Sequence, residues 1–283
     1  MNTKTWPNWL SPVWLVLASI VSVQFGAVMA KSLFAQADPA AVAWLRIAIA
    51  CPILLVVSRP RLRGRTYKEW LAVGAYGVAL ATMNIAIYQS FARIPVGLAV
   101  TIEFLGPLGV AFSGIRRVRD VVWVVLAGVG VVLLQTGPVV WDWAGIGFAL
   151  LSALGWAGYI LASGPVGRTW EGVSGVAVGL LVGGVGFAVP GILAGGATLL
   201  NPVVLGTAAA VALLSSVLPY GLEMVARRRI KASIFGILMS VEPAVAALMA
   251  FLVLRETLTP PEWAAMACVI AASIGATRTL ARK

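Results

Sequence analysis

The sequence predicts an all-α membrane protein with about ten transmembrane helices. Of its 283 residues, 60% are hydrophobic and only 11% are charged, and the mean hydropathy is +0.97. A soluble protein has about 45–50% apolar and about 25% charged residues, so a water-soluble fold could not bury this apolar surface. Only helices and closed barrels span a bilayer. Long apolar stretches without alternating polarity favour helices.

The apolar residues fall into stretches whose length suits a membrane-spanning helix, which needs about 20 residues. Pro and Gly stand between the stretches, for example at Asp38-Pro39, Asn201-Pro202 and Pro260-Pro261, where they mark helix limits. The ten predicted stretches are 13–30, 39–57, 70–90, 96–113, 120–137, 143–164, 172–195, 203–226, 233–254 and 262–278.

The composition argues against an enzyme and against a cofactor or metal. The chain has no His, and its two cysteines, Cys51 and Cys268, lie inside apolar stretches. This excludes Ser-His-Asp catalysis, His metal sites and a disulfide framework. No P-loop motif for nucleotides occurs. A membrane enzyme with paired Asp residues is disfavoured because the Asp residues all lie in predicted loops.

The distribution of Lys and Arg predicts the orientation. With a cytoplasmic N-terminus, 17 of the 21 Lys and Arg residues lie on the cytoplasmic side and three lie outside. By the positive-inside rule, both termini are cytoplasmic. The tails 1–12 and 279–283 are then cytoplasmic, and we expect a multi-pass protein of the bacterial inner membrane. Because the net charge of +11 reports topology and contact with the lipid bilayer, no nucleic-acid partner is expected.

The two halves of the chain repeat each other. Residues 93–107 match residues 229–243 at a constant offset of 136, and Arg119-Asp120 matches Arg255-Glu256. We therefore expect two five-helix repeats, 13–137 and 143–278. Because five is odd, the second repeat is inverted relative to the first. Inverted repeats are common in secondary transporters, with the substrate near the midplane between them.

Four ionisable residues lie inside the predicted helices. Placing each charge in the bilayer costs about 2.5–3.5 kcal/mol of free energy unless the side chain has a polar partner or contacts water. Glu103 and Glu242 lie in corresponding helices, near Pro107 and Pro243. Each proline leaves the carbonyl four residues back without a helix partner. One interpretation is that the acids bind a substrate ammonium or exchange a proton. The alternative is that hydrogen-bonded carboxyl groups lock the packing at proline kinks.

The other two, Glu223 and Arg46, favour structural roles. Glu223 is spaced to pair with Arg227 near the cytoplasmic end of its helix. Arg46 resembles a helix anchor, although it could also pair with an acid or receive a substrate carboxylate. Uncharged polar side chains either line a cavity or hold helices together; these are Asn84, Tyr88, Gln89, Trp156, Tyr159 and Ser163.

A ridge of Gly175, Gly179 and Gly183 lies in the seventh stretch. Small residues at this spacing allow close helix packing. A homodimer face is the alternative use of this ridge.

Three segments resemble a known family. Residues 94–111, 215–226 and 235–259 are similar to the threonine/homoserine exporter group, within the EamA-type branch of the drug/metabolite transporter superfamily. The resemblance implies an inner-membrane carrier that exports small amino acids, is driven by the proton gradient and has a central cavity between the halves. The matching motif residues are Glu103, Tyr220, Glu223 and Glu242. A structural or gating role is expected for Pro107, Pro219 and Pro243. The alternative is an exporter of another amphipathic metabolite or drug.

Overall fold

The computed structural model describes residues 11–113, 121–133, 142–227, 229, 235 and 238–281. All regular secondary structure in these ranges is helical, as the sequence predicts. Five helices are long and apolar enough to cross a membrane, and a pair bent by 58° raises this to six among the described residues. The chain is therefore a multi-pass membrane protein, and the full count of ten spans stays a prediction.

Each of the ten predicted stretches contains helix. The first half holds α1 Pro12–Ser32, α2 Pro39–Ser58, α3 Tyr67–Phe91, α4 Val96–Glu103, α5 Leu105–Ser113 and α6 Val121–Leu133. The second half holds α7 Trp143–Thr169, α8 Ser174–Gly186, α9 Ala188–Gly195, α10 Pro202–Ala212, α11 Leu218–Arg227, α13 Glu242–Leu254 and α14 Pro260–Ala281. A π-helical turn, Leu213–Val217, joins α10 to α11.

Side-chain caps start several helices where the sequence places Pro. The Asp38 carboxylate accepts a hydrogen bond from the Ala40 N–H at 2.8 Å, and the Asn201 side chain accepts one from the Val203 N–H at 2.9 Å. In both cases a Pro follows the cap, where its missing N–H costs nothing.

Two predicted helices are interrupted beside their acidic residue. The 96–113 stretch breaks at Phe104, between α4 and α5, and α13 begins at Glu242 after a turn at Ser240. The expectation of kinks inside continuous helices is thus corrected. Pro107 and Pro243 lie in the first turns of α5 and α13, where a Pro is tolerated because first-turn N–H groups have no helix partner.

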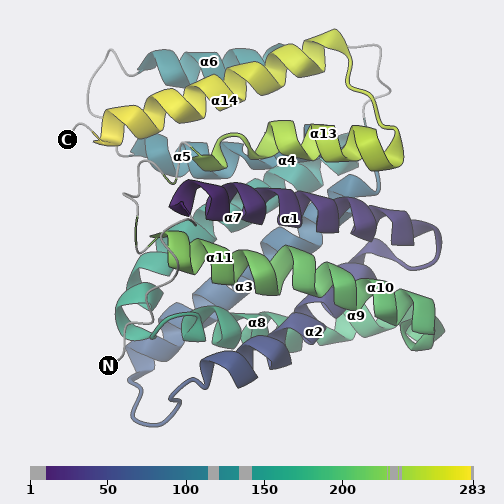
Figure 1. The fold of residues 1–283 in the computed structure, drawn as a ribbon, viewed down its shortest axis with the longest axis vertical. Helices are drawn as coiled ribbons and strands as arrows, with labels where there is room; N and C mark the ends of the chain where they lie inside the picture. The colour runs from purple at the N-terminus through teal and green to yellow at the C-terminus, as the bar shows by residue number, and fades with distance from the viewer. Residues whose placement is uncertain are drawn as a thin grey trace.

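The helices form one bundle with their long directions roughly aligned (Figure 1). α6 packs against α14 at one edge, and α2 packs against α8 and α9 at the opposite edge. Between these edges, α3 contacts α7, and α1 contacts α11 and α13. The start of α1 and the end of α14 lie at the same end of the bundle (Figure 1).

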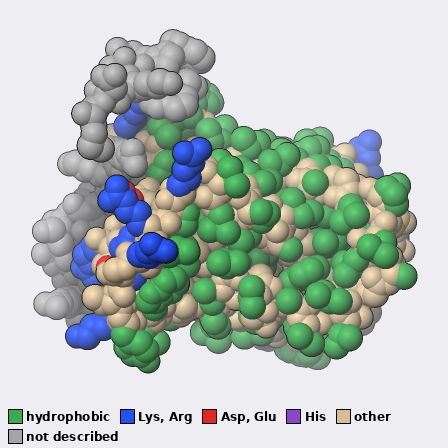
Figure 2. Space-filling view, turned by 90° about the horizontal axis from the view of Figure 1, so that it is seen from below, with side chains coloured by type: hydrophobic (Ala, Val, Ile, Leu, Met, Phe, Trp, Pro, Cys, Tyr) green, Lys and Arg blue, Asp and Glu red, His purple; other side chains and the backbone are tan. Residues whose placement is uncertain are grey.

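Most of the surface visible in Figure 2 is apolar. Figure 2 shows hydrophobic side chains over most of the visible face and a gathering of Lys and Arg at one end. Trp14, Trp143 and Trp263 are exposed near helix ends, as expected for residues that anchor a helix at the membrane surface. Trp6, Trp9 and Trp141 and the Arg residues between 116 and 119 lie outside the described residues.

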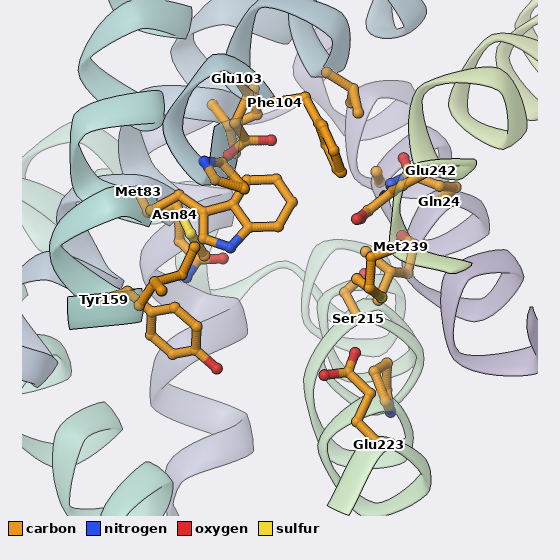
Figure 3. A pocket seen from close by; sticks show the side chains of 18 of the residues that line it. Gln24, Met83, Asn84, Glu103, Phe104, Tyr159, Ser215, Glu223, Met239 and Glu242 are labelled. Carbon is orange, nitrogen blue, oxygen red and sulfur yellow. Dashed lines mark hydrogen bonds between the residues drawn. The ribbon is translucent and has the colours of Figure 1, made fainter. Parts of the chain in front are cut away.

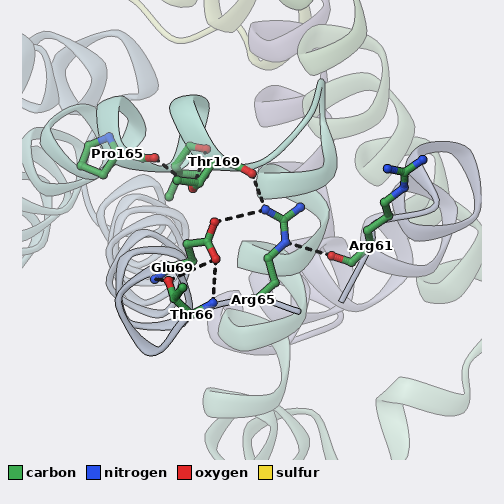
Figure 4. A network of polar contacts seen from close by, with 7 residues as sticks. Arg61, Arg65, Thr66, Glu69, Pro165 and Thr169 are labelled. Atoms are coloured by element: carbon green, nitrogen blue, oxygen red, sulfur yellow. Dashed lines mark hydrogen bonds and ion pairs between the residues drawn. The ribbon is translucent and has the colours of Figure 1, made fainter. Parts of the chain in front are cut away.

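Polar contacts tie the loops together at the end of the bundle where α2 finishes and α3 begins. Arg65 donates to the Arg61 carbonyl at 3.0 Å, to Glu69 at 3.4 Å and to the Thr169 carbonyl (Figure 4). Its guanidinium also lies 4.4 Å from the Trp170 ring centroid. The loop before α3 is thereby fixed to the end of α7.

A second set of contacts ties loops at the other end. Lys31 forms an ion pair of 2.6 Å with Glu256 and donates to the Ile94 carbonyl at 3.1 Å. The second oxygen of Glu256 accepts the Val96 N–H at 2.9 Å. We name these four residues the Lys31 clamp. It joins the end of α1, the loop before α4 and the loop after α13.

The Gly ridge of α8 packs inside the chain. A Cβ atom at Gly179 would lie 2.6 Å from the Tyr76 ring, and one at Gly183 would lie 2.7 Å from the Cβ of Ala81. Both neighbours belong to α3. The ridge therefore provides close packing of α8 on α3, which leaves it unavailable as a dimer face.

We expect Gly183→Ala to lower the thermal unfolding midpoint of the protein in detergent. The added methyl group overpacks the contact between α8 and α3, which lowers the free energy of unfolding by about 1–3 kcal/mol. The control is Gly186→Ala on the same helix, where nothing lies within 4 Å of the new Cβ. This control should be neutral or slightly stabilising, since Ala favours helix over Gly. Equal midpoints for both variants would contradict the packing described here.

Candidate functional site

A cavity of about 320 Å³ lies in the middle of the bundle, within the usual range for small-molecule sites. Its lining comes from both halves of the chain, including α1, α2, α3, α4, α7, α11 and α13. All four embedded ionisable residues, Arg46, Glu103, Glu223 and Glu242, line it.

The cavity has two facing walls (Figure 3). Met83, Asn84, Glu103, Phe104 and Tyr159 stand on one side, on α3, on the end of α4 and on α7. Gln24, Ser215, Glu223, Met239 and Glu242 stand on the other, on α1 and on elements of the second half.

Glu103 closes the end of α4, and it is 7% exposed. Its Oε1 atom lies 2.5 Å from the Ser152 hydroxyl, and that hydroxyl lies 2.8 Å from the Met83 carbonyl. A hydroxyl has one proton to donate. Ser152 can donate it to an ionised Glu103, or it can donate to the Met83 carbonyl and accept a hydrogen bond from a neutral Glu103. Both charge states of Glu103 therefore have a hydrogen-bond partner.

Glu242 begins α13 and is 6% exposed. Gln24 on α1 donates its side-chain amide to Oε1 of Glu242 at 2.9 Å. Oε2 of Glu242 and Oε1 of Gln24 are buried without a hydrogen-bond partner among the described residues. The N-terminus of α13 favours a negative charge at this position. Oε2 of Glu242 is therefore available to accept a hydrogen bond.

Glu223 faces inward, toward α1. The Ser19 hydroxyl donates to its Oε1 at 2.9 Å. The expected partner, the Arg227 side chain, lies outside what the structure describes. Two acids on one wall are therefore both held by polar residues of α1, Ser19 and Gln24. Tyr220, one turn before Glu223, also lines the cavity.

Arg46 is 7% exposed and is held by neutral groups. It donates to the Ser216 hydroxyl at 3.0 Å, to the Ser215 carbonyl at 2.6 Å and to the Tyr88 hydroxyl at 3.4 Å. Pro219 has no N–H to offer the Ser215 carbonyl four residues back. The π-turn and this proline therefore present a carbonyl to Arg46.

Aromatic rings form part of the first wall. Phe104 and Trp156 meet edge to face with centroids 5.3 Å apart, and Tyr159 lies 4.9 Å from Tyr76. Asn84 donates one N–H to the Leu80 carbonyl of its own helix at 2.7 Å. The cavity combines this apolar surface with a few fixed polar groups, as ligand sites do.

The structure brings most predicted site residues to the cavity but leaves some outside. Asn84, Tyr88, Pro107, Tyr159, Pro219 and Tyr220 line it together with the four ionisable residues. Gln89 does not, because it follows Tyr88 by about 100° around α3, and its side chain accepts from Arg93 at 2.7 Å. Pro243 and Ser163 are also outside the lining.

The sequence analysis missed Gln24, Ser152 and Ser215. An amide in the middle of the first apolar stretch could have signalled Gln24, whereas Ser residues are common in membrane helices. No group of three or more His, Cys, Asp or Glu that could hold a metal occurs in the described ranges.

The sequence of this chain is similar to those of known transporters. Residues 143–278 match the model of the EamA-like transporter family. The chain is 40% identical over 285 aligned positions to the threonine/homoserine exporter RhtA of Escherichia coli strain K12, covering 100% of this chain and 96% of that protein. It is 39% identical to the RhtA protein of Salmonella typhimurium strain LT2, with the same coverage.

A solved crystal structure shares the fold. Its TM-score is 0.64 at 17% sequence identity, over 95% of this chain and 98% of the other. Full-length similarity to the exporters, together with the helical bundle and its polar central cavity, shows that the chain belongs to the EamA-like transporter family of the drug/metabolite transporter superfamily.

Proposed function

We propose that this protein exports small amino acids, similar to threonine and homoserine, across the bacterial inner membrane. The identity to RhtA over the whole chain supports the substrate class. The observation that carries the proposal is the central cavity, in which three carboxyl groups and one guanidinium line a space of about 320 Å³. Such groups suit the ammonium and carboxylate of a zwitterion.

We further propose that the chain is built from two inverted five-helix repeats, 13–137 and 143–278. The repeat pairs α1 with α7, α3 with α10–α11, and α4–α5 with α13. Contacts support this pairing, because the packing of α1 on α11 and α13 has its counterpart in the packing of α7 on α3 and α5. The helix breaks at Phe104 and Ser240 also differ by 136 positions.

In this pairing, the elements that form one wall of the cavity correspond to the elements that form the other wall. One wall comes from α3, from the break between α4 and α5, and from α7; the corresponding α11, turn before α13, and α1 form the other (Figure 3). A site between two related units suits alternating access, in which one unit rocks against the other around the substrate. In this scheme the Lys31 clamp, which joins α1 and α4 to the loop after α13, opens when the outer side opens. The cytoplasmic location of both termini belongs to the same proposal.

We also propose that transport is coupled to protons, and the hydrogen-bond partners of Glu103 support this. Because the Ser152 hydroxyl can serve both charge states of Glu103, a proton can arrive or leave without stranding a buried polar group. We assign Glu103 to the proton and Glu242, with its unpartnered oxygen, to the substrate ammonium.

A second candidate substrate is a larger amphipathic metabolite or drug. The edge-to-face pair Phe104–Trp156 and the Tyr159 ring favour it, because they give one wall an aromatic surface. Competition between an aromatic cation and labelled threonine in proteoliposomes distinguishes the two. The amino-acid assignment expects competition from homoserine and none from the cation.

We expect Glu103→Gln and Glu242→Gln to reduce threonine efflux from proteoliposomes by different routes. Glu103→Gln should abolish the response of efflux to an imposed pH gradient. Glu242→Gln should raise the KM about tenfold or more, since a charge-assisted contact is lost. The control is Glu171→Gln, which is exposed and outside the cavity. Wild-type kinetics in both cavity variants would remove these acids from the mechanism.

Ser152→Ala tests the proton relay separately from the acid. Without the hydroxyl, a charged Glu103 is left buried with no donor, at a cost of about 1–3 kcal/mol. We therefore expect reduced pH-driven efflux and a lower unfolding midpoint. The matched control, Ser163→Ala on the same helix, removes only a bond to the Ile160 carbonyl of that helix and should change neither. Identical behaviour of the two Ser variants would refute the relay.

A further inference from the structure

Arg46 is a buried cation that lines the cavity without a carboxylate partner. The ion pairs in the described part of the chain are Lys31–Glu256 and Arg65–Glu69, and neither includes Arg46. A charged group inside the bilayer costs free energy unless its charge is neutralised or it contacts water. Arginine most often achieves this through a carboxylate or phosphate, whose paired oxygens match its planar fork.

The hydrogen bonds of Arg46 leave part of the guanidinium unused. A guanidinium carries five N–H donors, and three are directed at the Ser216 hydroxyl, the Tyr88 hydroxyl and the Ser215 carbonyl. One further N–H on each terminal nitrogen stays available. The Tyr88 contact is long, at 3.4 Å, so a stronger acceptor can displace it.

The side chain is fixed in place before any substrate arrives. Its Nε atom bonds to Ser216 at 3.0 Å, and its Nη2 atom bonds to the Ser215 carbonyl at 2.6 Å. That carbonyl belongs to the π-turn, which is itself held to α1 because the Ser22 hydroxyl donates to the Leu214 carbonyl at 2.6 Å. A preorganised donor loses little conformational entropy on binding.

The acids of the cavity are each engaged elsewhere. Glu103 bonds to Ser152, Glu223 to Ser19 and Glu242 to Gln24. Within the described residues, the hydrogen bonds of Arg46 therefore go to neutral oxygens, and no carboxylate lies within ion-pair distance of it.

We propose that Arg46 binds the carboxylate of the transported substrate and so restricts transport to carboxylate-bearing solutes. The assignment rests on the amino-acid export proposed above and replaces the helix-anchor role that the sequence favours. The carboxylate takes the two remaining N–H groups of the guanidinium. The ammonium of the same zwitterion then faces the glutamates of the cavity.

The test compares threonine with threoninamide, which has the same side chain and amine but no carboxylate. Each compound is used to inhibit the transport of radiolabelled threonine into proteoliposomes. In the wild-type protein, threonine should compete at least about tenfold better than threoninamide, because the amide forfeits the charge-assisted bonds. This comparison needs no variant and so cannot fail through misfolding.

Variants then locate the discrimination at Arg46. Arg46→Gln should weaken inhibition by threonine about tenfold or more and leave inhibition by threoninamide unchanged. The ratio of the two inhibition constants then approaches one. Arg46→Lys keeps the charge without the fork and should give an intermediate ratio. Arg93→Gln is the matched control, since Arg93 is exposed, lies outside the cavity and donates to Gln89.

The outcomes separate this inference from the proposed function. If wild-type protein transports threonine but does not discriminate against threoninamide, Arg46 does not bind the carboxylate and amino-acid export still stands. The same holds if Arg46→Gln, with an unchanged unfolding midpoint, keeps the wild-type ratio. If wild-type protein transports no amino acid, the proposed function itself fails.

Discussion

The structure depends on one constraint, which is the cost of placing charged and polar groups inside an apolar bilayer. Such groups must find partners or line a wet cavity. Arg46, Glu103, Glu223 and Glu242 satisfy this together, because all four reach the same central cavity and each has a polar partner. The cavity is therefore where the chain can hold charge at membrane depth.

The irregular parts of the backbone follow the same constraint. α4 ends at Glu103, α13 begins at Glu242, and the π-turn precedes Pro219. Each interruption frees backbone groups, and non-helical backbone is tolerated at membrane depth only where protein or a cavity can satisfy it. Here the freed Ser215 carbonyl binds Arg46, and the N-terminus of α13 faces Glu242. The breaks thus coincide with side chains that line the cavity.

Packing outside the cavity keeps this arrangement rigid. α8 approaches α3 closely along its Gly ridge, while the Arg65 network and the Lys31 clamp fix loops at the two ends of the bundle. Both sets of loop contacts join the two proposed repeats. Arg65 connects the start of α3 to the end of α7, and Lys31 connects the end of α1 to the loop after α13.

Much of the fold was predictable because the controlling signals are local. Apolar stretches and Pro-containing caps such as Asp38-Pro39 identified the helical segments, and an acid such as Glu103 in an apolar stretch identified the cavity. Side-chain direction was harder to predict: Gln89 was grouped with Tyr88, although consecutive residues on a helix face different ways. The roles of Ser152 and Gln24 could not be predicted, since they depend on which distant helix lies opposite. Arg46 was interpreted as an anchor because its neutral partners come from a π-turn that the sequence does not announce.

The most direct test of the account is whether the cavity is wet and occupied by substrate. A small water-soluble thiol reagent is applied to Asn84→Cys in a background where Cys51 and Cys268 are replaced by Ala. Asn84 lines the cavity, so we predict labelling that saturating threonine slows, while Ser163→Cys outside the cavity is labelled at a rate that threonine leaves unchanged. An unreactive Asn84→Cys, or a labelling rate that threonine does not alter, would contradict the account.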